Sequence, residues 1–341
     1  MAFNVDKLHI LDETPLQYLP SMSRALGIQL FIKRDDLTPF GAGGNKMRKL
    51  EYLVQDALDQ GATMLITVGG GQTNHGRQTA AMAAKYGLKC AIVAIDDYPG
   101  ELSANMLLDR LFGCDLILKA DDGRRESVQF DELTQQVIKE YEDKGEKVYF
   151  IPLGGSNVIG DLGYYDCAVE LDRQAKELGI GHARVIDAVG SMGTHLGLYC
   201  GLKDIKSDLH LTGIAISPFS QAKGEKMVSE LIKLKMTYGM DVDGTLEDLD
   251  VETGYVRGGY NLPSKEVRDA IKLMASKEGI LLDPCYTGKA MAGIIDMVFE
   301  GKIAQGEDVI FVHTGGMPGL YTPHHRVEFE KELMDGVRII E

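Results

Sequence analysis

Short apolar segments rich in β-branched residues alternate with amphipathic helical patterns along most of this chain, and this alternation constrains the fold more than any other feature. The apolar segments are almost continuous in hydrophobicity, as expected of parallel strands that are buried on both faces. They lie at residues 28–33, 63–68, 89–95, 114–119, 147–152, 184–189, 211–217 and 308–313. Strands and helices in this order predict an α/β protein with open, twisted, mostly parallel sheets.

Length and charge limit what such a protein can do. A chain of 341 residues exceeds the usual size of one compact unit, so we expect two domains. The formal net charge of −15 argues against nucleic acid or an anionic membrane as a partner, because both attract basic surfaces.

Three further features bear on the location of the protein. No apolar stretch approaches the roughly 20 residues of a membrane-spanning helix, and the first residues lack the pattern of a secretory signal. The five cysteines are scattered without the spacing of a zinc site, which indicates reduced thiols and no bound metal. We therefore expect a cytoplasmic protein.

Glycine clusters stand at the ends of several predicted strands, which is where ligands bind in open parallel sheets. The clusters are VGGGQTNHG, PLGGSN, VGSMGTHLG and HTGGMPG, and GAGGNK precedes a predicted helix. One pair of glycines is ordinary turn chemistry, but five such loops indicate that they converge on one bound molecule.

The third cluster leads from a strand into a helix through Ser191, Met192, Gly193 and Thr194. Free backbone N–H groups and the helix dipole favour phosphate there, and the two hydroxyls can add donors. The alternative is a tight turn with Thr194 as the helix N-cap. A dinucleotide site is disfavoured, because Asn74 stands where the third glycine of that fingerprint would fall.

Lys46 follows the glycines of GAGGNK at the start of a predicted helix. A cation there opposes the helix dipole, so its position needs a cause unless it is an ordinary surface lysine. A lysine with a lowered pKa can form a Schiff base with an aldehyde cofactor. An aldehyde and a phosphate on one ligand describe pyridoxal 5′-phosphate.

Six segments resemble, in order, the signatures of the D-cysteine desulfhydrase and 1-aminocyclopropane-1-carboxylate deaminase family. They are KRDDLTPFGAGGNKMRKLEYL, TNHGRQTAAMAAKYGLKC, GGSNVIGDLGYYDCAVEL, GGYNLP, EGILLDPCYTGKAMAGIID and VHTGGMPGLY, from about Lys33 to Leu320. The resemblance implies a pyridoxal-phosphate enzyme with the tryptophan synthase β-like fold (fold type II) that forms a homodimer. It also implies a large domain of residues 1–48 and 158–341 and a small domain of residues 49–157.

The resemblance further implies a role for individual residues. For the cofactor, it implies Lys46 as the Schiff-base lysine, Asn74 at the phenolic oxygen, Thr287 at the pyridine nitrogen and Thr314 beside the ring. The cofactor phosphate would be bound by Ser191, Met192, Gly193 and Thr194. The substrate carboxylate would be bound by Thr73, Asn74 and His75, and the active-site tyrosines would be Tyr260 and Tyr286.

Two positions bear on the substrate. The deaminase branch carries glutamate where this chain has Thr287, and a neutral hydroxyl makes the ring a weaker electron sink, which favours direct loss of a β leaving group. Thr287 could instead cap the helix that follows it. Family members more often carry serine at Thr73, whose extra methyl is expected to narrow the pocket.

These residues predict a lyase that removes a β-substituent from a small amino acid. The first choice is D-cysteine, which would give pyruvate, ammonia and hydrogen sulfide, with the Lys46 amine or a tyrosinate as the base. The alternatives are an L-cysteate sulfo-lyase or another β-substituted alanine lyase, a 1-aminocyclopropane-1-carboxylate deaminase, and a non-catalytic binding protein on the same fold. Selectivity between D and L substrates stays open.

Overall fold

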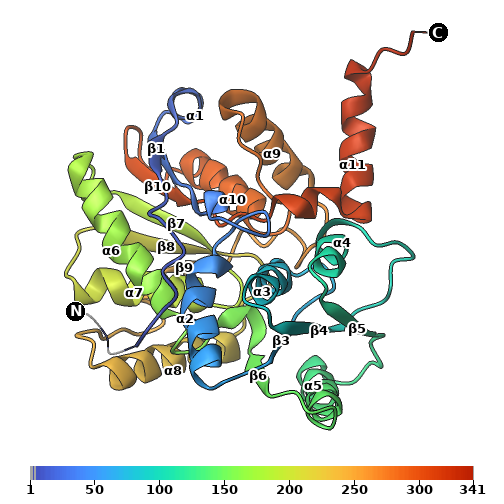
Figure 1. Ribbon diagram of the computed structural model, residues 1–341. Helices are drawn as coiled ribbons and strands as arrows, with labels where there is room; N and C mark the ends of the chain where they lie inside the picture. The colour runs from blue at the N-terminus through green and yellow to red at the C-terminus, as the bar shows by residue number, and fades with distance from the viewer. Residues whose placement is uncertain (1–2, 4, 341) are drawn as a thin grey trace.

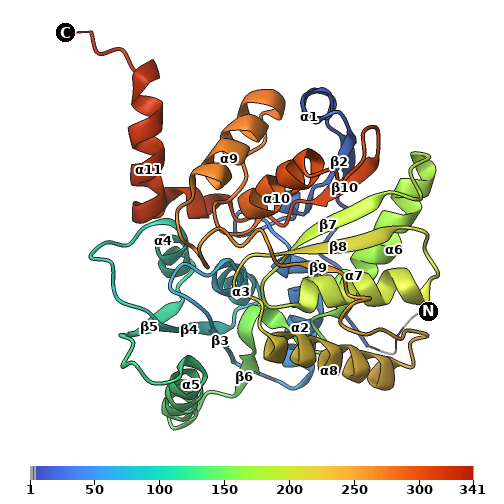
Figure 2. The same cartoon turned by 180° about the vertical axis from the view of Figure 1, so that it is seen from behind.

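Two mostly parallel sheets form the framework of the protein, as a computed structural model that describes residue 3 and residues 5–340 reveals (Figures 1 and 2). The larger sheet has the order β1-β2-β10-β7-β8-β9, in which β1 runs antiparallel to β2 and the other pairs are parallel. The smaller sheet has the order β5-β4-β3-β6 and is parallel throughout. The predicted fold class is confirmed.

The strands of the larger sheet are β1 (Leu16–Tyr18), β2 (Gln29–Lys33), β7 (Arg184–Val189), β8 (His210–Ala215), β9 (Val251–Glu252) and β10 (Asp308–Val312). Those of the smaller sheet are β3 (Met64–Val68), β4 (Lys89–Ile95), β5 (Asp115–Lys119) and β6 (Val148–Ile151). All eight predicted strands are present. β1 and β9 were not predicted, because segments of three and two residues are too short to produce a periodic signal.

Helices cover both faces of each sheet. The α-helices among the described residues are α1 (Pro20–Leu26), α2 (Lys46–Asp59), α3 (Asn74–Lys85), α4 (Ala104–Leu111), α5 (Glu126–Glu142), α6 (Leu162–Glu177), α7 (Gly193–Asp204), α8 (Gln221–Tyr238), α9 (Lys265–Glu278), α10 (Thr287–Phe299) and α11 (Pro323–Leu333). α1, α9 and α10 pack on one face of the larger sheet, and α6 and α7 pack on the other. In the smaller sheet, α2 and α3 cover one face and α5 the other.

The last strand of the chain lies in the middle of the larger sheet. β10 pairs with β2 on one side, where Asp308 is opposite Gln29, and with β7 on the other, where Val309 is opposite Arg184. The smaller sheet is formed entirely by the segment between β2 and β7. The domain bounds given above stay a prediction.

The C-terminal helix α11 projects away from the rest of the molecule (Figures 1 and 2). None of the helices formed by the described residues is both long and apolar enough to cross a membrane. All five cysteines are buried and unpaired.

Candidate active site

The candidate site forms where loops after strands of both sheets meet. The loop before α2 packs directly on the loop after β10, since a Cβ placed on Gly315 would lie 2.8 Å from the Cα of Gly44. The backbone N–H of Asn45 donates to the carbonyl of Thr314 at 3.0 Å. Glycine is needed at these positions because the two backbones come too close for side chains, and both glycines have positive φ.

Lys46 is the first residue of α2 and is half-buried. Its Nζ has no hydrogen-bond partner in the part of the chain that the structure describes. A Cβ on Gly154 would lie 3.4 Å from this Nζ and 2.3 Å from Ser191 Oγ, so the amine lies beside the predicted phosphate loop. Burial, and then the charge of Lys49, lower the pKa of Lys46 well below its usual value, although Asp161 opposes this. The amine is therefore poised to be neutral.

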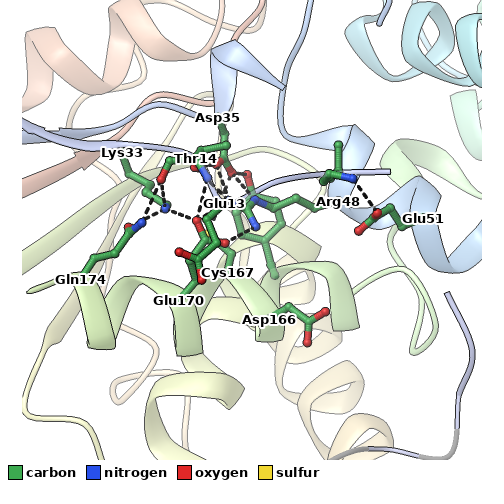
Figure 3. A network of polar contacts seen from close by, with 12 residues as sticks. Glu13, Thr14, Lys33, Asp35, Arg48, Glu51, Asp166, Cys167, Glu170 and Gln174 are labelled. Carbon is green, nitrogen blue, oxygen red and sulfur yellow. Dashed lines mark hydrogen bonds and ion pairs between the residues drawn. The ribbon is translucent and has the colours of Figure 1, made fainter. Parts of the chain in front are cut away.

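A buried ion network anchors α2 two residues beyond Lys46 (Figure 3). Arg48 donates to both carboxylate oxygens of Asp35, each at 2.9 Å, and to Glu170 at 2.8 Å. Lys33 pairs with the same glutamate. Burial alone would raise the pKa of Asp35, but the charge and hydrogen bonds of Arg48, the charge of Lys33 and the Tyr164 hydrogen bond together outweigh it, and the pKa is lowered. The network fixes the start of α2 against β2 and α6.

The predicted phosphate loop enters α7 through a strained residue. Met192 has φ +75°, a left-handed conformation that is rare outside glycine, and it is the N-cap of α7. The N–H of Gly193 lies 3.3 Å from Ser156 Oγ, which donates to Ser191 Oγ at 2.9 Å. Thr194 is not the N-cap, and its hydroxyl accepts a hydrogen bond from Asn45 at 2.9 Å.

A second lysine lies beneath this loop and was not predicted. Lys49 is fully buried and donates to Asp161 at 3.0 Å and to Ser156 Oγ at 3.1 Å. A Cβ on Gly193 would lie 2.3 Å from Lys49 Nζ. The signal for Lys49 was its spacing, because residues three apart in a helix lie on the same side, and Lys46 is three residues before it.

Thr73 and Gly76 fit together at the start of α3. The Thr73 hydroxyl caps the helix by accepting the N–H of Gly76 at 3.2 Å. A Cβ on Gly76 would lie 2.4 Å from the Thr73 methyl and 2.8 Å from Ile92 Cδ1. The methyl is accommodated inside the loop by the missing side chain of Gly76, so it need not narrow the pocket as expected.

His75 is buried beside the same loop. Its ring nitrogens both lack hydrogen-bond partners among the described residues, although only 3% of the residue is exposed. Burial, followed by the charges of Lys46 and Lys49, lowers the pKa of His75 well below its usual value. A neutral imidazole without a partner is costly in a protein interior.

Asn74 lies between the start of α3 and the last glycine loop. Its side-chain oxygen accepts hydrogen bonds from Arg77 at 3.1 Å and from Asn105 at 3.0 Å. A Cβ on Gly316 would lie 2.8 Å from Asn74 Nδ2 and equally close to Asp283. Neither Arg77 nor Asn105 was predicted from the sequence.

The two predicted tyrosines are in contact. The hydroxyl oxygens of Tyr260 and Tyr286 lie 2.7 Å apart, and a Cβ on Gly190 would lie 3.1 Å from the ring of Tyr286. Burial of the hydroxyls, and then the Tyr286 phenol for Tyr260 and the Cys285 thiol for Tyr286, raise both pKa values above their usual range. Both phenols therefore hold their protons at neutral pH.

Thr287 is the first residue of α10 and is fully buried. Its hydroxyl donates to Asp283 at 2.7 Å and accepts the N–H of the same residue at 2.7 Å. The Asp283 carboxylate also accepts the backbone N–H groups of Cys285, Tyr286 and Thr287. Asp283 is thus the group that caps this helix start, and Thr287 belongs to the capping turn.

The structure brings predicted residues from distant loops close together. Gly154 lies against both Lys46 and Ser191, Tyr286 lies against Gly190, Asn45 bonds to Thr194 and Thr314, and Asn74 lies against Gly316. Their individual roles stay predictions.

Comparison with known proteins places this site in a family. The sequence profile described as "Pyridoxal-phosphate dependent enzyme" matches residues 8–315. Curated relatives named D-cysteine desulfhydrase, from Salmonella schwarzengrund and Salmonella typhimurium, are each 40% identical over 318 residues. The alignment with each covers 92% of this chain and 94% of the relative.

Solved structures also support this family and its fold. A crystal structure described as an ACC deaminase homologue superimposes with a TM-score of 0.87 and 35% identity, and the match covers 97% of both chains. A fungal L-serine ammonia-lyase from Rhizomucor miehei has a TM-score of 0.67 at 19% identity, which shows the shared fold.

Proposed function

Because this chain belongs to the pyridoxal-phosphate dependent enzymes, we propose that it is a lyase that eliminates the β-substituent of a small amino acid, with D-cysteine as the first substrate. The observation that carries the proposal is the position of Lys46. Its amine has no partner, its pKa is lowered, and it lies beside a loop suited to phosphate.

The residues present fit pyridoxal phosphate. Lys46 offers the amine that would hold an aldehyde. The start of α7 offers backbone N–H groups and the Ser191 and Thr194 hydroxyls, with Lys49 beneath them as a cation for a phosphate. Asn74 would donate to the phenolic oxygen, Thr287 would hold the position at the pyridine nitrogen, and Thr314 would border the ring. When bound, the cofactor supplies an electron sink for the charge that develops on the substrate α-carbon.

Lys46 is the base that we propose for the α-proton. An amine with a lowered pKa is neutral and can accept a proton near pH 7. The raised pKa values of Tyr260 and Tyr286 make a tyrosinate the less favourable choice. As protonated phenols, the two tyrosines can instead donate a proton to the departing β-substituent.

The start of α3 would bind the substrate carboxylate. Its first N–H groups, those of Asn74 and His75, have no acceptor within the helix, and the helix dipole favours a negative charge there. Thr73 caps the helix and so holds the loop that presents these groups. The neutral His75 ring adds no charge to this end of the site.

The proposed reaction converts D-cysteine and water to pyruvate, ammonia and hydrogen sulfide. It follows the name that relatives at 40% identity carry. Deamination of 1-aminocyclopropane-1-carboxylate is the second candidate, because a solved homologue of that deaminase is 35% identical. Thr287 offers a neutral hydroxyl, already bonded to Asp283, where the deaminase branch carries a glutamate carboxylate. This difference favours elimination.

A product assay tests the proposal. Purified protein loaded with pyridoxal phosphate should absorb visible light and release pyruvate and hydrogen sulfide from D-cysteine. The same assay would include L-cysteine, L-cysteate, β-chloroalanine and the cyclopropane substrate, whose product is 2-oxobutyrate. Turnover of the cyclopropane alone would overturn the choice of elimination, and turnover of none would favour a binding protein.

We also propose a homodimer in a reducing compartment, the cytoplasm. Apolar side chains are exposed along α11 and the segment that follows it, where a second copy could cover them. They are Val327, Leu333, Met334, Val337, Ile339 and Ile340. Light scattering should give twice the chain mass, and I339D/I340D should shift the protein toward the monomer; a wild-type monomer would refute the dimer.

A further inference from the structure

We propose that Asn105, on α4, is a positioning residue that sets which way the side-chain amide of Asn74 points. The inference rests on the proposed function, in which Asn74 donates to an oxygen of the bound cofactor. It adds a residue from outside the loops described so far, and from a helix of the smaller sheet.

The amide of Asn105 has one possible orientation. Its Oδ1 accepts from Arg77 at 2.8 Å, and its Nδ2 donates to the backbone carbonyl of Gln72 at 2.7 Å. A guanidinium can only donate and a carbonyl can only accept, so the oxygen and nitrogen of this amide cannot be exchanged. Asn105 is 1% exposed, and solvent cannot replace either partner.

The orientation of Asn105 determines that of Asn74. The second N–H of Asn105 Nδ2 donates to Asn74 Oδ1 at 3.0 Å, and Arg77 donates to the same oxygen at 3.1 Å. Two donors hold the oxygen of Asn74 on the inner side. Its Nδ2 therefore faces the other way, toward Gly316, and presents N–H groups only.

The backbone of α4 is strained at the point that delivers Asn105. Ala104, directly before it, has φ +47°, which costs an L-residue about 1–2 kcal/mol. Gln72 holds this turn from both sides: its Oε1 accepts the N–H of Asn105 at 2.9 Å, and its Nε2 donates to the carbonyl of Ser103 at 3.2 Å. Strain of this kind persists where surrounding contacts over-determine the conformation.

Arg77 alone does not replace Asn105. It lies on the same helix as Asn74 and divides its donors between Asn74, Asn105 and the carbonyl of Gly43. Without the Asn105 amide, Asn74 Oδ1 keeps one of its two donors, and a rotated amide would present an acceptor to the cofactor oxygen. Two oxygens would then face each other without a proton between them.

The variant N105D tests the inference, because it keeps the size of the side chain and replaces the donor that faces Asn74 with an acceptor. We expect the dissociation constant for pyridoxal phosphate to rise roughly 10- to 100-fold, as for loss of a hydrogen bond to a charged oxygen. We also expect the visible absorption band of the loaded protein to shift as it does in N74A. N105A should also raise the dissociation constant and shift the absorption band in the same direction as N105D.

A double-mutant cycle and a packing control separate positioning from stability. In the N74A background, N105D should have less than a twofold further effect on the dissociation constant. M106A removes a buried neighbour on the same helix and should lower the melting temperature while leaving the band in place. Additive effects of N105D and N74A, an unshifted band in both Asn105 variants, or the same shift in M106A would overturn the proposal.

The wild-type protein distinguishes this proposal from the one on which it rests. If the wild type binds pyridoxal phosphate with a Lys46-dependent band but N105D behaves like it, only the role of Asn105 fails. If the wild type gives no such band, the proposed function fails and the role of Asn105 fails with it.

Discussion

The first turn of α2 has two sides that differ in how their polar groups are satisfied. On one side, the Arg48 guanidinium makes four hydrogen bonds to the carboxylates of Asp35 and Glu170 and a fifth to the Thr14 hydroxyl. On the other side, Lys46 Nζ and the buried ring of His75, which belongs to the neighbouring start of α3, have no hydrogen-bond partner among the described residues.

The difference between paired and unpaired polar groups distinguishes residues that stabilise the fold from residues that are available to bind a ligand. Buried polar groups are normally paired, so a paired network can fix the backbone and then contribute nothing to ligand binding. Unpaired groups next to it raise the free energy of the folded chain until a ligand pairs them. The Arg48 network fixes the start of α2, and this keeps the unpaired Lys46 amine in position for a ligand.

Replacing Lys46 should have the largest effect on function and little effect on the fold. K46A should lower kcat by at least about 1,000-fold and abolish the visible absorption, because no other amine replaces the nucleophile and base. Its melting temperature without cofactor should be unchanged or higher. A K46A protein that retains both the band and turnover would contradict the role of Lys46.

Replacing Arg48 should do the opposite. R48M leaves Asp35 buried without its paired cation and leaves Glu170 with Lys33 alone, so it should lower the free energy of unfolding by about 3–5 kcal/mol. Urea unfolding measures this loss. The exposed pair of Lys139 and Asp143 provides the matched control, since K139M should cost no more than about 1 kcal/mol. Equal costs for the two variants would show that the network does not anchor α2.

A smaller effect is expected at Gly76. G76A would place a methyl 2.4 Å from that of Thr73 and should cost about 1–3 kcal/mol in unfolding free energy. It should also raise KM, because the carboxylate loop shifts. T73S/G76A removes the clash with the Thr73 methyl but not the one with Ile92, so it should regain part of both losses; no rescue at all would show that Thr73 and Gly76 are not coupled.

The smallest effect is a change in how stability depends on pH. Lys46 has a lowered pKa in the folded chain and an ordinary pKa near 10.4 when unfolded. Between these values the unfolded chain binds one more proton, so the free energy of unfolding rises with pH. K46M should flatten this rise on the alkaline side, below the ordinary lysine pKa of about 10.4, whereas K139M should not. An unchanged slope in K46M would mean that the amine is not perturbed.

The sequence predicted the sheets and the main loops because both have local signals. Buried strands give continuous apolar runs, and glycine clusters mark the ends of β3, β6, β7 and β10. The resemblance to a family supplied the residues at those ends. The relatives and the solved homologue confirm the family, while the roles of the individual residues stay predictions.

The rest depended on contacts between distant segments, which one sequence does not display. Lys49 acquires its partner Asp161, and Asn105 its partner Asn74, only when segments 112 and 31 residues apart are folded together. Thr73 was interpreted alone, although its methyl fits only because Gly76 lacks a side chain. Thr194 was a reasonable N-cap by residue type, but Met192 in a left-handed conformation starts the helix.

The place of β10 in the larger sheet has a consequence for how the protein is made. β10 is synthesised last, yet β2 and β7 both pair with it, and Thr314 follows it directly. The smaller sheet can complete its pairing while the ribosome is still translating, because all four of its strands precede β7. The larger sheet has to wait for contacts across almost the whole chain, which are slow to form. A nascent chain therefore has no complete site until translation is nearly over. A chain truncated before residue 308 lacks β10, so it can form the smaller sheet but not the complete larger sheet or the site.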